Sequence, residues 1–332
     1  MLNRTITHLL AGAVVALGVT AAQAKDLAFS VFVPAASPTV SAVYQPWIDW
    51  FNEKAAPHDV SIKLYAGGTL GRSPLAQAQM VADGVADMAL TVPSYTPGVY
   101  PDFDMFELPG FIGNVKEGSL AALELHQEGK LSGYEDYYVV AIYTSDTYML
   151  HSKPEIKSFD DIAGKRFRVA GQIQTAVVEA LGGVPQNASA GEMAEAIDRG
   201  LLDGALTDAS VARTFRVSDV ATNHYAAKLG VLVFTIVMNR GVYEDLPAEV
   251  KDLLAQSGQI VADNQIASYG PAVARNLEQW EASDEHTVVQ PSEEDRARID
   301  EAVAPVIDRV AAAATPGLLE AFKSKLEEIR AR

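Results

Sequence analysis

The sequence contains no cysteine, which excludes disulfide bonds, thiol chemistry and a lipid anchor on a cysteine side chain. It is also poor in basic residues, with 26 Lys and Arg against 43 Asp and Glu and a formal net charge of −17. Such an acidic chain is not expected to bind nucleic acid or an anionic membrane surface. An anionic ligand would therefore need a local concentration of positive charge.

The chain also lacks, after residue 24, any apolar run long enough to cross a bilayer, so we expect a soluble mature protein without direct membrane insertion. The apolar segment from Leu9 to Ala21 follows Arg4 and precedes Ala22-Gln23-Ala24. This order is typical of a signal peptide cleaved after Ala24, and it favours export over a buried N-terminal helix. We expect residues 1–24 to be removed.

The motifs of common enzymes are missing as well. The sequence has no G-x-S-x-G, no G-x-x-x-x-G-K-[ST] and no G-x-G-x-x-G, and its histidines lack the spacing of metal ligands. The acidic clusters at 160–161 and 293–295 are typical of helix caps and turns rather than calcium sites. We expect no catalytic residue, no metal and no cofactor, while an exported enzyme that uses Asp or Glu stays an alternative.

Strand-like and helix-like segments alternate along the chain, which predicts an α/β architecture with mostly parallel sheets and about two domains. Two apolar stretches, Tyr137 to Leu150 and Leu229 to Asn239, have the pattern of strands that cross between the domains. A long helix extends to about Glu281, and the last helix places Leu319, Phe322, Leu326 and Ile329 on one face.

An internal repeat supports two related lobes. Residues 80–91 and 196–207 both read as a helix end, a glycine, a short step with Asp, and then Ala-Leu-Thr in a strand. Gly84 and Gly200 are placed to be left-handed helix caps. Ligands of open α/β sheets bind beyond the carboxyl ends of strands, so Thr91 to Ser94 and Thr207-Asp208 would face each other across a cleft. Any helix-glycine-strand corner shares part of this pattern.

The segment from Ser158 to Gly171 contains the candidate ligand-binding charge. Arg166 and Arg168 share one face of a predicted strand, and a helix from Gln172 to Leu181 follows. A strand-to-helix corner offers free backbone N–H groups and the positive end of a helix dipole, and beside an arginine these suit a carboxylate. A solvated arginine at the end of a strand is the simpler interpretation of this segment alone.

Several segments in a fixed order resemble the solute receptors of tripartite ATP-independent periplasmic (TRAP) transporters, DctP family. They are Gly68-Thr69-Leu70-Gly71-Arg72, Gly84-Val85-Ala86-Asp87-Met88-Ala89, Tyr100-Pro101-Asp102-Phe103, Phe106-Glu107-Leu108-Pro109-Gly110-Phe111, the stretch from Ser158 to Val169, Leu202-Asp203-Gly204, and Asn239 to Pro247. The resemblance covers essentially the whole mature chain. It implies a periplasmic protein that binds a small organic acid between two α/β lobes and delivers it to a sodium-coupled permease.

The resemblance also implies a site and a division into lobes. The carboxylate-clamping arginine of the family falls on Arg168, and Tyr148, Thr207 and Ser94 are further candidate contacts. Asp208 is expected to cap the next helix and, as an alternative, to accept a hydroxyl or ammonium group of the ligand. We expect one lobe from 25–148 plus about 239–275, and another from 149–238 plus about 276–332, with long C-terminal helices.

The family pattern is incomplete in this chain. Many members have Gln-Glu-Asn-Pro where this sequence has Ala205 to Asp208, and Tyr148 stands where some place a second polar or basic contact. The ligand therefore cannot be carried over from a relative. A receptor of an ATP-driven importer, which shares the two-lobe arrangement, stays an alternative.

Overall fold

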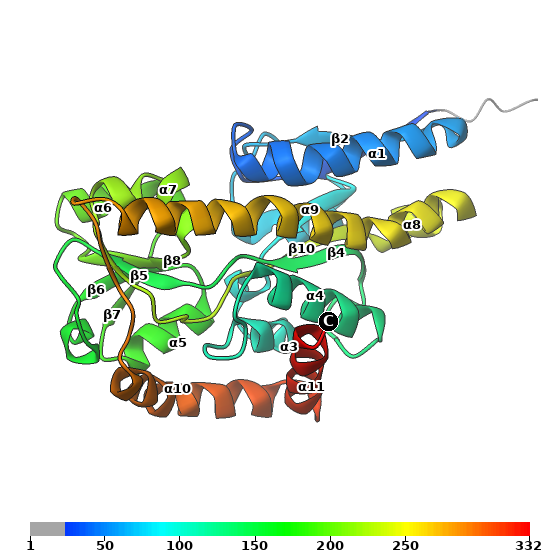
Figure 1. Ribbon diagram of the computed structural model, residues 1–332. Helices are drawn as coiled ribbons and strands as arrows, with labels where there is room; N and C mark the ends of the chain where they lie inside the picture. The colour runs from blue at the N-terminus through cyan, green and yellow to red at the C-terminus, as the bar shows by residue number, and fades with distance from the viewer. Residues whose placement is uncertain (1–23) are drawn as a thin grey trace, which may run out of the picture.

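The computed structural model describes residues 24–332, so the predicted signal peptide lies outside the described residues except for Ala24. Two sheets form the centre of the molecule, and helices cover them (Figure 1). The five-stranded sheet has the order β2-β1-β3-β10-β4, and the six-stranded sheet has the order β11-β9-β5-β8-β6-β7. We call the parts built on these sheets the first lobe and the second lobe. This arrangement confirms the predicted α/β fold.

The strands of the first lobe are β1 (Lys25–Ser30), β2 (Val60–Tyr65), β3 (Met88–Thr91), β4 (Tyr137–Thr144) and β10 (Val233–Asn239). Those of the second lobe are β5 (Met149–Ser152), β6 (Arg166–Val169), β7 (Val184–Asn187), β8 (Gly204–Thr207), β9 (Asn223–Tyr225) and β11 (Thr287–Val289). The helices are α1 (Gln45–Ala55), α2 (Gln77–Ala82), α3 (Pro101–Asp104), α4 (Val115–Gln127), α5 (Gln172–Ala180), α6 (Met193–Asp198), α7 (Ala209–Thr214), α8 (Arg240–Glu244), α9 (Ala248–Glu281), α10 (Glu293–Ala313) and α11 (Leu318–Arg330).

The chain crosses between the lobes where the sequence predicted it. The stretch from Tyr137 to Leu150 becomes β4 of the first lobe and β5 of the second, and the chain returns from β9 to β10. The two crossings are joined by backbone hydrogen bonds, from Tyr148 N to Gly230 O at 2.7 Å and from Leu229 N to Tyr148 O at 2.8 Å. Helix α9 is a third connection, because it packs on β4 in the first lobe and on α7 in the second (Figure 1).

The expectation of mostly parallel sheets is wrong for the strands that these crossings supply. Strand β10 is antiparallel to both β3 and β4, and β5 is antiparallel to both β8 and β9. The remaining pairs, such as β1 with β2 and β6 with β8, are parallel. A strand that enters from the other lobe has no helical crossover to set its direction, so the parallel rule does not apply to it.

The internal repeat is confirmed in its local geometry. Gly84 and Gly200 have φ values of 70° and 72°, which other residues rarely adopt. Gly84 N donates to Val81 O at 3.2 Å, and Gly200 N donates to Ile197 O at 3.0 Å. Each glycine ends its helix and turns the chain into the strand, β3 or β8, that leads to the cleft.

The C-terminal helices lie along one side of the molecule (Figure 1). Helix α10 packs on α5 and α3, whereas α11 packs on α4. Phe322, Leu326 and Ile329 of α11 are buried as expected, with Leu318 in place of Leu319. The proposed sequence limits of the two lobes stay a prediction.

Within residues 24–332, no single helix has the length and apolar composition needed to cross a membrane. The bent pair formed by α10 and α11 meets both criteria only when the two helices are taken together.

Candidate ligand-binding cleft

The two arginines of β6 lie in different surroundings although they share a face of the strand. Arg166 is at the outer end, where its Nη2 pairs with Asp203 Oδ1 at 2.9 Å and its side chain is 41% exposed. Arg168 is only 4% exposed, and its Nε donates to Ala188 O at 2.9 Å. A guanidinium has five N–H donors, so after the bond to Ala188 and the contact with Tyr95, donors on the terminal nitrogens remain for a carboxylate. Arg168 is therefore a buried cation with spare hydrogen-bonding capacity.

The corner after β6 brings the second lobe against the first. Gly171 precedes α5, and a Cβ atom on it would lie 2.5 Å from Ser94 Oγ of the first lobe. Glycine is thus required here by the close approach of a neighbouring side chain. Ser94 is 1% exposed, and its hydroxyl has no hydrogen-bond partner among the described residues.

Two glutamines of α5 bind buried acids of the first lobe. Gln172 Nε2 donates to Asp104 Oδ2 at 2.5 Å, and Gln174 Nε2 donates to Glu107 Oε2 at 2.9 Å. The other carboxylate oxygen of Glu107 accepts from Val233 N at 3.2 Å. Burial raises the pKa of Asp104 to about 7. Burial, with a smaller effect of Asp104, raises the pKa of Glu107 to about 8.

The raised pKa of Glu107 predicts that this carboxyl contributes a loss of stability as the pH rises from about 4.5 to 8. The unfolded chain releases the Glu107 proton near pH 4.3, whereas the folded chain retains it to about pH 8, so deprotonation favours unfolding across this range. We expect Glu107→Gln to reduce this loss by about 3 kcal/mol, as measured by denaturant unfolding at pH 5 and pH 8. Equal pH dependence in both proteins would contradict the assignment.

Asp208 caps α7, as the sequence predicted. Its Oδ1 accepts from Ser210 N at 2.8 Å and from Val211 N at 3.0 Å, and Tyr269 of α9 donates its hydroxyl to the same carboxylate at 3.0 Å. Burial raises the pKa of Asp208 to about 7. Most of its acceptor capacity is used within the protein. The alternative of a ligand contact depends on Oδ2, which accepts only from Tyr269 among the described residues.

Tyr148 lies near both Asp208 and Arg168. It is 2% exposed, and burial raises its pKa well above the usual range, an effect that Asp208 increases and Arg168 opposes. Thr207, at the end of β8, is fully buried, and its hydroxyl has no partner among the described residues. Thr91 differs, because its hydroxyl contacts Thr235 and Tyr134 inside the first lobe.

The five residues selected from the sequence are therefore all buried near the junction of the lobes: Ser94, Tyr148, Arg168, Thr207 and Asp208. Sequence reasoning missed Tyr95, Glu107, Gln174 and Tyr269. Burial raises the pKa of Tyr95, and Arg168 beside it opposes this effect. Its position next to Ser94 was the one signal available. Gln174 lies on the helix predicted to follow β6 and Glu107 in a segment that carries the family resemblance, but neither pattern indicated that these side chains would meet. Tyr269 of α9 had no motif to indicate it.

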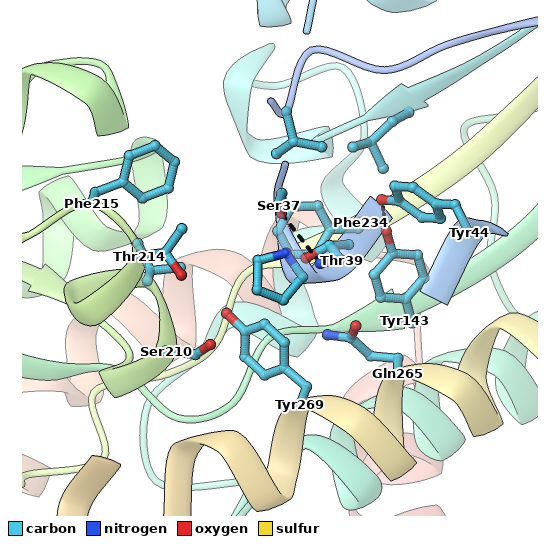
Figure 2. A pocket seen from close by; sticks show the side chains of 14 residues that line it. Ser37, Thr39, Tyr44, Tyr143, Ser210, Thr214, Phe215, Phe234, Gln265 and Tyr269 are labelled. Atoms are coloured by element: carbon cyan, nitrogen blue, oxygen red, sulfur yellow. Dashed lines mark hydrogen bonds between the residues drawn. The ribbon is translucent and has the colours of Figure 1, made fainter. Parts of the chain in front are cut away.

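A cavity of about 80 Å³ lies between the lobes on the side of α9 (Figure 2). Tyr44, Tyr143 and Phe234 line it from the first lobe, and α7 contributes Ser210 and Thr214. Its other lining residues are Val33, Ser37, Pro38, Thr39, Leu90, Val211, Phe215, Gln265 and Tyr269. Tyr269 connects the cavity to Asp208, and through it to the neighbourhood of Tyr148 and Arg168.

No group of three or more His, Asp or Glu side chains within residues 24–332 is arranged to hold a metal ion. His151 Nδ1 and His224 Nδ1 are 2.7 Å apart, and His224 Nε2 lies 3.0 Å from His286 Nδ1. Because His224 uses opposite ring nitrogens for these contacts, the three rings form a chain and do not converge on one point.

Comparison with known proteins agrees with this architecture. The model of the DctP family, described as bacterial extracellular solute-binding protein, family 7, matches residues 29–314. A solute-binding protein of Sulfitobacter sp. (strain NAS-14.1) is 26% identical over 280 residues, which are 80% of this chain and 82% of that protein. The C4-dicarboxylate-binding periplasmic protein DctP of Rhodobacter capsulatus is 24% identical over 267 residues, covering 78% and 79%.

A solved structure shares the same fold. It is a TRAP solute-binding protein of Rhodoferax ferrireducens T118 in complex with copurified benzoate. Its TM-score is 0.83 at 22% identity, and the match covers 92% of this chain and 98% of that one.

Proposed function

Because this chain belongs to the bacterial extracellular solute-binding proteins of family 7, and is thus a solute receptor rather than an enzyme, we propose that it binds a small carboxylate between its lobes. The observation that carries the proposal is the burial of Arg168, at 4% exposed, beside residues of both lobes. A cation is kept in such a place when a partner compensates for its desolvation. A ligand carboxylate is that partner, bound by two parallel N–H donors.

The contacts around Arg168 explain how the lobes would respond to the ligand. Gln172 and Gln174 of the second lobe bind acids of the first lobe, and Ser94 lies against Gly171. A ligand that contacts both lobes binds their closed arrangement more tightly than the open one, and therefore shifts the population towards closure. Small-angle scattering is expected to show a smaller radius of gyration with ligand than without it.

We further propose that the protein acts in the periplasm and delivers its ligand to a TRAP-type membrane permease. Support comes from the family and from relatives named for, or solved with, acids: C4-dicarboxylates for the Rhodobacter protein and benzoate for the Rhodoferax protein. Uptake into vesicles that contain the permease is expected to need this protein and a sodium gradient. A requirement for ATP instead would favour an ATP-driven importer.

A thermal-shift screen of organic acids tests the binding proposal on the chain from Lys25 onward. A ligand at 100 times its dissociation constant adds about 2.7 kcal/mol to the free energy of unfolding. For a chain of this size we expect a rise in melting temperature of about 4 °C. Stabilisation by neutral sugars but by no acid would contradict the proposal.

A further inference from the structure

Buried positive charge is scarce in this protein. Within residues 24–332, the buried Lys and Arg side chains are Arg168 and Lys325. Lys325 lies on α11, where ion pairs with Glu124, Glu128 and Glu328 at 3.2, 2.7 and 3.0 Å surround it. Arg168 is therefore the one buried cation of this part of the chain that could neutralise a ligand at the junction of the lobes.

Buried acidic side chains are, by contrast, abundant near Arg168. The charges of Glu107, Asp208 and Arg168 all influence the pKa of Tyr148, so these side chains lie near one another. Asp104 is buried beside Glu107, and Asp146 is buried beside Asp208. A second ligand carboxylate would enter this region without a basic partner. Burying an unpaired charge is far more costly than burying a paired one.

The cavity beside Asp208 has a different character. None of its 14 lining residues is Asp, Glu, Lys, Arg or His. The rings of Tyr143 and Phe234 stack at 5.4 Å, and Tyr269, Tyr44 and Phe215 add further aromatic surface (Figure 2). Such a lining binds apolar groups, because their burial removes them from water without desolvating a charge.

One lining residue indicates that the cavity receives something from outside the protein. Gln265 is 1% exposed, and its Nε2 donates to Thr144 O at 3.0 Å. Its Oε1 has no donor among the described residues. Buried polar atoms are normally paired, so a donor group on a ligand, such as a hydroxyl, would complete this amide.

We propose that the ligand is a monocarboxylate, with its carboxylate on Arg168 and a small, largely apolar body in this cavity. The inference rests on the proposed function and narrows it. A volume of about 80 Å³ is smaller than the roughly 150 Å³ that accommodates benzene, so a short alkyl group fits directly and a ring requires slight opening of the lobes. Dicarboxylates and sugar acids are selected against.

Calorimetry with two matched pairs of acids tests the inference: pentanoate against glutarate, and benzoate against terephthalate. The members of each pair share a carbon skeleton or ring and differ by one carboxylate. We expect at least one monocarboxylate to bind at least 100-fold more tightly than its dicarboxylate partner. Tighter binding of the dicarboxylates, of an amino acid or of glucuronate would overturn the inference, as would binding of neither monocarboxylate.

A charge added to the cavity provides a second test. Thr214 is exposed and lines the cavity at the end of α7, so Thr214→Lys supplies a cation there without filling a core position. We expect it to improve glutarate binding at least tenfold. Thr287→Lys on β11 adds the same charge at an exposed position outside the lining and is the matched control. Equal effects of the two variants, or none, would contradict the proposed placement of the ligand.

Failure of the inference can be distinguished from failure of the proposed function. If glutarate binds more tightly than pentanoate and this binding is lost in Arg168→Ala, the receptor binds carboxylates at Arg168 but is not selective for monocarboxylates. If no acid binds to the unmodified protein, the proposed function fails, and the inference that rests on it fails as well.

Discussion

Arg168→Ala is expected to weaken binding of the carboxylate ligand by about 2–5 kcal/mol, roughly 30- to 5,000-fold. The loss is large because the substitution leaves a carboxylate buried without its cation, in a region that holds Glu107 and Asp208. Titration calorimetry measures the effect directly. An unchanged affinity for the true ligand would show that Arg168 is not the carboxylate contact.

Arg166→Ala is the matched control, since Arg166 is on the same strand and face but pairs with Asp203 at the surface. We expect its affinity for the ligand to stay within about twofold of the unmodified protein, because exposed ion pairs contribute little. Arg168→Lys separates charge from geometry. Lysine keeps the charge but lacks the planar pair of donors, so an intermediate affinity is expected. Thermal unfolding of each variant establishes that a loss of binding is not a loss of fold.

The second large effect is expected at Gly230, which lies in the return crossing between the lobes. Its φ of +95° is unfavourable for any residue with a side chain, and a Cβ there would lie 2.2 Å from the backbone oxygen of Glu107. The backbone of residue 230 cannot shift freely to relieve this contact, because Gly230 O accepts a hydrogen bond from Tyr148 N at 2.7 Å. We expect Gly230→Ala to lower the free energy of unfolding by about 3 kcal/mol or more, as measured by urea unfolding.

Gly98→Ala is the control for the backbone angle alone. Gly98 has a φ of +77°, but a Cβ on it would have no atom within 4 Å. We expect it to cost only about 1 kcal/mol, the usual penalty for a left-handed alanine. Similar losses in both variants would show that the contact with Glu107 contributes nothing. Gly230→Ala is also expected to weaken ligand binding, since it displaces the backbone partner of Tyr148.

Some predictions about the cleft succeeded because they depend on neighbours in sequence. Asp208 caps α7 through bonds to Ser210 and Val211, two and three residues further on. The burial of Arg168 could be anticipated only with the family resemblance, because the segment alone favoured a solvated arginine. The buried acids could not be found in this way. Glu107 meets Gln174 and Val233 across 67 and 126 residues, and no local pattern indicates that a glutamate will be buried.

The sequence by itself determined the periodic strands and helices, the glycine caps at Gly84 and Gly200, the crossing segments and the family. These features follow from backbone preferences and side-chain periods that act over a few residues. Only the tertiary structure decided that β5 and β10 run antiparallel to their neighbours, that acids gather around one buried arginine, and that the cavity beside them carries no charge. Those properties depend on which distant segments pack together, because tertiary packing sets both the cost of burying a charge and the benefit of pairing it.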